Sequence, residues 1–208
     1  MISNDQDSLY LGVSQYFRML NDLQTKKLTH YFQLLDFDNN GTVEKDDFIA
    51  IAENLCILWG IKEGSPKYEK YTSMYEESWR EFRNSVVHKD PEQSTLAEWL
   101  EFADRYIVNG TDEFFDRYMQ RATREIFDTF DNNGDGFISL DEYTDLFMAY
   151  NIQVRYSAKS YIHLDLNSDD LLSRSEMLSA VDEFFRSPEV EAPGNWLFGF
   201  WGNREQPI

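Results

Sequence analysis

Twelve consecutive residues, 131–142, carry oxygen-bearing side chains at alternate positions. The first, third and fifth are Asp, Asn and Asp, the sixth is Gly, and the twelfth is Glu. A calcium ion takes six to eight oxygen ligands at roughly 2.3–2.6 Å, and a tightly turning chain can aim alternate side chains at one point. The glycine suits the sharp bend, and the glutamate can offer both carboxylate oxygens. The expected ligands are the side chains of Asp131, Asn133, Asp135 and Glu142, with the backbone carbonyl of Phe137.

This spacing is the EF-hand calcium-loop pattern, and it recurs twice in the chain. Residues 36–47 have Asp, Asp and Asn at the first, third and fifth positions and glycine at the sixth. Residues 165–176 have Asp, Asn and Asp at those positions and a closing Glu. The expected side-chain ligands are Asp36, Asp38, Asn40 and Asp47 in the first loop, and Asp165, Asn167, Asp169 and Glu176 in the last.

The flanks of the three loops repeat as well. The residues one and four positions before each loop are apolar, and such spacing makes a buried stripe on a helix: Leu35 and Phe32, Phe130 and Phe127, Leu164 and Tyr161. Each unit is therefore predicted to be helix–loop–helix, with the first helix running from about Val13 to Leu35. The alternative is an Asp- and Asn-rich turn between helices that binds no metal.

Two loops depart from the ideal pattern. The first closes in Asp47, which is one methylene shorter than Glu, so a bidentate contact is harder and magnesium gains relative to calcium. The last carries Asp170 where glycine is expected, and a left-handed Asp costs roughly 1 kcal/mol. We expect three sites of unequal affinity.

The spacing of the loops predicts a fourth unit. The last two loops start 34 residues apart (165 − 131), whereas the first and third start 95 apart (131 − 36). A loop at about 87–98 would be the missing partner, because 95–99 resembles the exit of the third loop, 139–143. Its ligand positions hold Val87, Lys89 and Pro91, so it is predicted to bind no metal. The expected organisation is an N-terminal pair over 1–110 and a C-terminal pair over 111–186.

Composition excludes several classes of function. The formal net charge of −19 argues against nucleic acid or an anionic membrane as the main partner. Cys56 is the only cysteine, which favours a reducing compartment. The first residues lack a secretory signal, and no apolar run is long enough to be a transmembrane segment. We expect a cytoplasmic monomer.

The C-terminal tail, 187–208, is unusually aromatic. A turn-rich connector leads into Trp196, Leu197, Phe198, Phe200 and Trp201, which are poorly suited to water. We expect the tail to fold back and pack between the two pairs of hands; the alternative is an anchor for a protein target or a membrane surface.

The chain resembles the invertebrate sarcoplasmic calcium-binding proteins and, within them, is similar to calexcitin-type proteins. The resemblance is carried by 46–48, the long segment before a degenerate second hand, 98–100, 141–143 and the ending 192–199. It implies an all-α, compact fold of two EF-hand pairs with three ion sites. It also implies backbone ligands at Thr42 and Leu171. The implied function is a calcium and magnesium buffer or, in the calexcitin branch, a sensor with a protein target.

Two other classes of function compete with this interpretation. An enzyme is conceivable, because the superfamily includes a protein resembling juvenile hormone diol kinase, but the phosphate-binding motif G-x-x-x-x-G-K-[ST] is absent. A small-ligand carrier or photoprotein also uses EF-hands, with a cavity lined by His, Trp and Tyr. Candidates for such a lining are His30, His88, His163, Trp59, Trp79 and Trp99. We predict a calcium-binding protein without catalytic residues.

Overall fold

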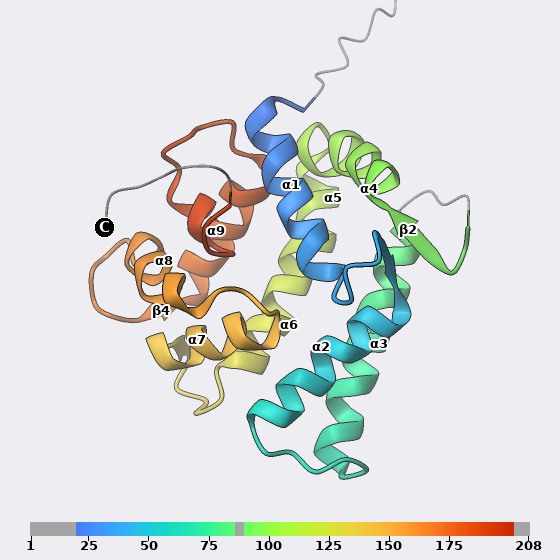
Figure 1. Cartoon of the computed structure of the whole chain (residues 1–208). Helices are drawn as coiled ribbons and strands as arrows, with labels where there is room; N and C mark the ends of the chain where they lie inside the picture. The colour runs from blue at the N-terminus through green and yellow to red at the C-terminus, as the bar shows by residue number, and fades with distance from the viewer. Residues whose placement is uncertain (1–19, 86–89, 202–208) are drawn as a thin grey trace, which may run out of the picture.

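The computed structural model describes residues 20–85 and 90–201. Two helix–loop–helix units form its N-terminal half (Figure 1). The first unit consists of α1 (Asp22–Leu35), β1 (Thr42–Glu44) and α2 (Lys45–Leu58). The second consists of α3 (Pro66–Ser85), β2 (Gln93–Thr95), α4 (Leu96–Phe102) and the π-helical turn η1 (Ala103–Val108).

The C-terminal half repeats this order. The third unit consists of α5 (Asp112–Phe115), the π-helical turn η2 (Asp116–Gln120), α6 (Arg121–Phe130), β3 (Phe137–Ile138) and α7 (Leu140–Ala149). The fourth consists of η3 (Val154–Tyr156), α8 (Ser157–Leu164), β4 (Leu172–Ser173) and α9 (Arg174–Arg186), and the short helix η4 (Pro193–Trp196) follows. The predicted all-α EF-hand fold of four units with tiny loop–loop β contacts is confirmed.

The start of the first helix was predicted wrongly. Asn21 is extended (φ −74°, ψ 171°), its side chain accepts from the Gln24 backbone N–H, and the Gln24 side chain accepts from the Asn21 N–H. This reciprocal capping box begins α1 at Asp22 instead of continuing a helix from Val13. Residues 13–19 lie outside the described part of the chain.

The hands are paired through their loops. Strand β1 pairs with β2 in antiparallel fashion, with Val43 opposite Ser94. Strand β3 pairs with β4, with Ile138 opposite Leu172. Each strand is only two or three residues long, so the packing of the flanking helices, rather than the sheets, provides most of the apolar burial.

The two halves share one core around α1. This helix contacts α4 on one side and α9 on the other (Figure 1). Trp99 of α4 is 1% exposed, and its indole N–H donates to the Leu28 carbonyl of α1 over 3.0 Å. Between the halves, α2 packs on α7. The indole N–H of Trp59 donates to Asp145 there, over 2.8 Å.

The described part of the tail contacts both halves. The Leu197 carbonyl accepts from the Tyr143 hydroxyl of α7 over 2.7 Å, and the Phe198 carbonyl lies 2.9 Å from Nε2 of His30 in α1. The Phe198 ring is 5.3 Å from the Tyr31 ring and 4.9 Å from the Phe184 ring, between centroids. Residues 202–208 lie outside the described part.

Across the described ranges, no helix combines the length and the apolar character that crossing a bilayer requires.

Candidate metal centres and an apolar cavity

The first loop folds around its own carboxylates. Backbone N–H groups of Gly41 and Asn40 donate to Asp36 Oδ2 (3.0 Å) and Asp38 Oδ1 (2.9 Å). The N–H of Thr42 donates to Asn40 Oδ1 over 2.8 Å. These bonds turn the three side chains inward, and one oxygen of each of Asp36, Asp38 and Asp47 lies within 4.8 Å of the others. Such convergence suits a hard divalent cation.

The closing residue of the first loop fixes both of its ends. Asp47 Oδ1 accepts from the Phe37 N–H at 3.0 Å, and Oδ2 accepts from the Glu44 N–H at 2.7 Å. Burial raises the pKa of Asp47, whereas hydrogen bonds from the backbone of Glu44 and Asp38 lower it and the Asp38 charge raises it. A nearby cation would favour the ionised form of this carboxylate.

The third loop repeats these contacts. The N–H of Gly136 donates to Asp131 Oδ2 (3.0 Å), and the N–H of Asp135 donates to Asn133 Oδ1 (2.7 Å). The closing Glu142 is 8% exposed; its Oε1 accepts from the Asn132 N–H and its Oε2 from the Ser139 N–H. Asp135 Oδ1 accepts from the Phe137 N–H, over 2.9 Å.

Two buried oxygens in these loops lack a partner. Oδ1 of Asp36 and Oδ1 of Asp131 each stand at the first loop position, and neither has a hydrogen-bond donor in the structure. Leaving a buried carboxylate oxygen unpaired is costly, whereas a cation at the centre of the loop would satisfy it. The residues of these two loops therefore fit calcium.

The fourth loop differs at its first residue. Asp165 Oδ2 accepts from the Asp170 N–H (2.9 Å), and Oδ1 accepts from the Asp169 N–H (3.2 Å), so both oxygens have donors. The N–H groups of Asp169 and Leu171 also donate to Asn167 Oδ1 and Asp169 Oδ1. The closing Glu176 accepts from the N–H groups of Leu166 and Ser173. The same pattern of backbone N–H donors and side-chain oxygen acceptors occurs here, with one more side-chain oxygen accepting from the backbone.

The backbone is left-handed at two positions in each of the loops 36–47, 131–142 and 165–176. At the sixth position, φ is 94° for Gly41, 88° for Gly136 and 64° for Asp170. The fourth position is also left-handed, with φ of 60° at Asn39, 73° at Gly134 and 58° at Ser168. Sequence reasoning missed this second bend, although Asn and Gly favour that conformation.

A tyrosine braces the C-terminal pair of loops. The Tyr161 hydroxyl lies 2.8 Å from the Asp170 carbonyl and 2.9 Å from the Ile138 carbonyl, so its single hydrogen is shared between two loops. This contact holds the left-handed Asp170 against the strand pair. From the sequence, Tyr161 was predicted only to be a buried apolar residue before the loop 165–176.

The second loop keeps the exit half of the pattern. In the other pair, Ile138 and Leu172 are both eighth in their loops; Ser94, opposite Val43, is the eighth residue counted from 87. Glu98 Oε2 accepts from the Thr95 N–H over 2.9 Å, as the glutamates of the third and fourth loops do from their serines. Two of the expected ligand positions, Val87 and Lys89, lie outside the described residues; Pro91 is exposed.

The predicted carbonyl ligands stand where the loops enter their strands. Thr42 begins β1, Phe137 begins β3, and Leu171 directly precedes β4.

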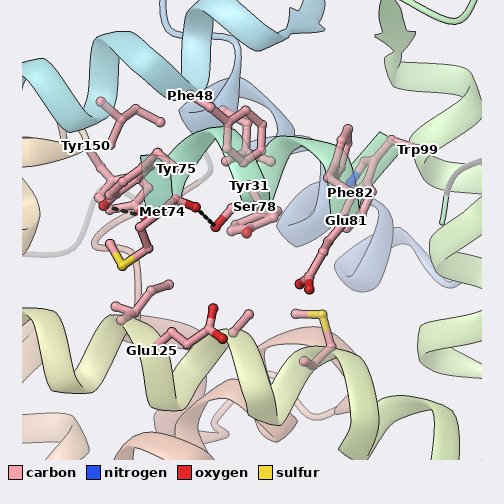
Figure 2. Close-up of a pocket in the computed structure, with 15 residues that line it drawn as sticks. Tyr31, Phe48, Met74, Tyr75, Ser78, Glu81, Phe82, Trp99, Glu125 and Tyr150 are labelled. Atoms are coloured by element: carbon pink, nitrogen blue, oxygen red, sulfur yellow. Dashed lines mark hydrogen bonds between the residues drawn. The ribbon is translucent and has the colours of Figure 1, made fainter. Parts of the chain in front are cut away.

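An apolar cavity lies between α3 and α6 (Figure 2). Its volume is about 90 Å³, and its lining includes Tyr31, Met74, Tyr75, Trp99 and Tyr150. A second cavity of about 40 Å³ reaches toward Leu197 and Phe198 in the tail. The two cavities have five lining residues in common: Tyr31, Met119, Ala122, Ile126 and Tyr150.

Comparison with known families and proteins agrees with this geometry. The family model "EF hand domain" matches residues 122–150, and the model "EF-hand domain pair" matches residues 5–55. Calerythrin from Saccharopolyspora erythraea is 23% identical over 177 residues, which are 85% of this chain and 100% of calerythrin. Fold, loops and family matches together define an EF-hand calcium-binding protein.

Solved structures place the fold more narrowly. The sarcoplasmic calcium-binding protein from amphioxus matches with a TM-score of 0.64 at 20% identity, over 87% of this chain and 98% of that one. The calcium-loaded apo form of the coelenterazine-binding protein from Renilla muelleri matches with a TM-score of 0.69 at 18% identity, over 86% and 99%. Together with the match to calerythrin, the similarity to the amphioxus protein confirms the resemblance to sarcoplasmic calcium-binding proteins.

Proposed function

We propose that the protein binds three calcium ions, at loops 36–47, 131–142 and 165–176, and acts as a calcium buffer. The observation that carries the proposal is the pair of buried, unpartnered Oδ1 atoms of Asp36 and Asp131, each at the first position of its loop. The loop 165–176 has the same kind of backbone N–H contacts to its side-chain oxygens, so it is included as a third, weaker site.

The first loop is the one proposed to take magnesium as well. Its three carboxylates, Asp36, Asp38 and Asp47, approach within 4.8 Å of one another. A short closing aspartate supports six-coordinate binding, and magnesium demands that geometry at about 2.0–2.1 Å.

The packing of the C-terminal tail favours the function of a calcium buffer over that of a sensor. Sensors open their helix pairs and expose an apolar groove to a protein target. Here Leu197 and Phe198 are 1% and 9% exposed, and they cover apolar surface of α1, α7 and α9. A covered groove supports storage of calcium by a monomer without a protein target. The single, buried thiol of Cys56 supports the reducing cytoplasm as its location.

Calcium titration with magnesium present tests this proposal. We expect calorimetry to give three ions per chain, and we expect the fluorescence of a dye for apolar surface to change little on calcium binding. A large rise in dye fluorescence would show a sensor, and a stoichiometry of one or none would contradict the assigned sites.

Carriage of an apolar small molecule is the second candidate, and the cavity between α3 and α6 favours it. A volume of about 90 Å³ exceeds the roughly 10–15 Å³ that one water molecule needs. One protein of the same fold is a coelenterazine-binding protein. Carriage and calcium binding are compatible, because the loops and the cavity use different residues.

Light-emitting or phosphoryl-transfer chemistry is not part of the proposal. Nε2 of His30 lies 2.9 Å from the Phe198 carbonyl, and burial lowers the pKa of this imidazole. His163 is stacked on Trp196, with 4.2 Å between ring centroids. Neither lines the cavity, and His88 lies outside the described residues. A chain that acts by binding alone agrees with the relatives, which are calcium-binding proteins.

A further inference from the structure

Charged side chains lie at the mouth of the larger cavity, the one between α3 and α6, where they would favour ligands of one charge over the other. Glu81 of α3 and Glu125 of α6 both line the cavity, and Figure 2 shows the two carboxylates directed into the space between these helices. Arg121 bridges them, with its guanidinium 3.0 Å from Glu81 and 2.9 Å from Glu125. A carboxylate offers about four lone-pair sites, so each of these two can accept a further donor beside Arg121.

The interior of the cavity offers mostly apolar and aromatic surface. The Ser78 hydroxyl donates to the Met74 carbonyl over 3.0 Å, and the hydroxyls of Tyr75 and Tyr150 are paired at 3.3 Å. These polar groups are already hydrogen-bonded within the protein, so a bound molecule would contact aromatic rings and methionine thioethers inside the cavity. Methionine side chains adapt their shape to such guests.

We infer that the cavity takes an aromatic molecule with a protonated amine, the ring lying inside and the ammonium at the mouth. This inference rests on the proposed carriage of an apolar molecule. The ammonium would share Glu81 and Glu125 with Arg121, whereas a carboxylate at the same place would be repelled. The acidic net charge of −19 also favours the approach of a cation.

Three probes with the same ring test the charge preference: phenethylammonium, ethylbenzene and phenylacetate. Affinities are measured by ligand-observed NMR on the calcium-saturated full chain at about 0.15 M salt. We expect phenethylammonium to bind about fivefold more tightly than ethylbenzene, as an ion pair at a partly exposed site allows, and phenylacetate to bind most weakly.

Matched variants locate the effect. Glu125→Gln should bring phenethylammonium close to ethylbenzene in affinity, because it removes one of the two carboxylates proposed to bind the ammonium. Glu63→Gln, at an exposed loop position, should keep the preference and so controls for the overall charge of the chain. Ala122→Leu should weaken all three probes by filling the cavity, whereas Ala158→Leu, at an exposed position of α8, should weaken none. Circular dichroism confirms that each variant is folded.

The outcomes separate the two claims. Carriage is supported if ethylbenzene binds and Ala122→Leu abolishes that binding. The preference for a cation is nevertheless overturned if phenethylammonium binds no more tightly than ethylbenzene, or if Glu125→Gln leaves its affinity unchanged. If none of the three probes binds, both the carriage and the preference are overturned. Tighter binding of phenylacetate would also refute the assigned charge of the mouth.

Discussion

At the residue scale, each of the three loops closes on one carboxylate at its twelfth position. Asp47, Glu142 and Glu176 each tie the start of their own loop to its exit through backbone N–H donors. The same carboxylates are the proposed metal ligands. At this position, side-chain length distinguishes the first loop, which closes in aspartate, from the other two, which close in glutamate.

Glu142→Gln should remove one calcium ion from the stoichiometry and leave the helical content unchanged. The amide keeps the size of the side chain but loses the charge and one of the acceptor oxygens. Calorimetric titration measures the change, and Asp141→Asn, the exposed neighbour, is the matched control. An unchanged stoichiometry in Glu142→Gln would refute the ligand role of this residue.

Asp47→Glu should raise the calcium affinity of the first loop relative to its magnesium affinity by about tenfold. The added methylene lets both oxygens reach the ion, which calcium accommodates and magnesium does not. Competition titration measures the ratio, with Asp46→Glu, exposed and one residue earlier, as the control. A ratio unaltered by Asp47→Glu would show that side-chain length does not set the preference.

The residue patterns of the loops could be read directly from the sequence, because ligand types and bends are local. The bend at Asp170 was foreseen, since the residue stands where glycine normally does, and its φ is 64°. The bend at Ser168 was not, because serine carries no strong preference for left-handed backbone.

At the element scale, the units and their order were predictable, whereas one boundary was not. The helices that flank the three loops follow from the apolar spacing next to the loops. The register of the second loop also followed, because its exit resembles that of the third loop. The first helix began later than predicted, since the capping signal at Asn21 outweighs the apolar residues before it.

Tyr161→Phe should destabilise the C-terminal pair by about 1–2 kcal/mol, because the carbonyls of Ile138 and Asp170 lose their shared donor. Urea unfolding in calcium-free buffer measures the difference. Tyr156→Phe is the control, since no hydrogen bond of the Tyr156 hydroxyl is seen in the described residues. Equal stability of Tyr161→Phe and wild type would show that the brace contributes nothing.

At the scale of the whole molecule, a buried lysine joins the first helix to the end of the chain. Lys27 is 0% exposed, and its ammonium donates to the carbonyls of Glu183 (3.0 Å) and Ser187 (2.8 Å) and to Asn195 Oδ1 (3.0 Å). Each of the three ammonium N–H groups of Lys27 thus has an oxygen acceptor. No local pattern distinguishes Lys27 from the solvent-exposed lysines, because its partners lie about 160 residues away in the chain.

The lowering of the Lys27 pKa below the ordinary lysine value should be measurable in a titration. Burial lowers it from 10.5 to about 8, and the Glu183 charge partly offsets this. Between these values the unfolded chain holds the proton and the folded chain does not. The contribution of Lys27 to the unfolding free energy therefore rises with pH across this window, by at most about 3 kcal/mol.

NMR titration of the lysine ε-carbons measures this pKa directly, with Lys27→Met used only to assign the signal. A Lys27 resonance that titrates at the ordinary lysine value of 10.5 would contradict the buried environment. If Lys27→Met does not fold, the signal can be assigned from its contacts with Phe184, whose ring lies 5.8 Å from Nζ.

The central claim, that carboxylate and amide oxygens from three short loops converge on divalent metal, is tested most directly by native mass spectrometry of the chain in calcium. We predict a dominant species with three bound ions, and two ions for Glu142→Gln. A chain that remains free of metal in millimolar calcium would contradict the account.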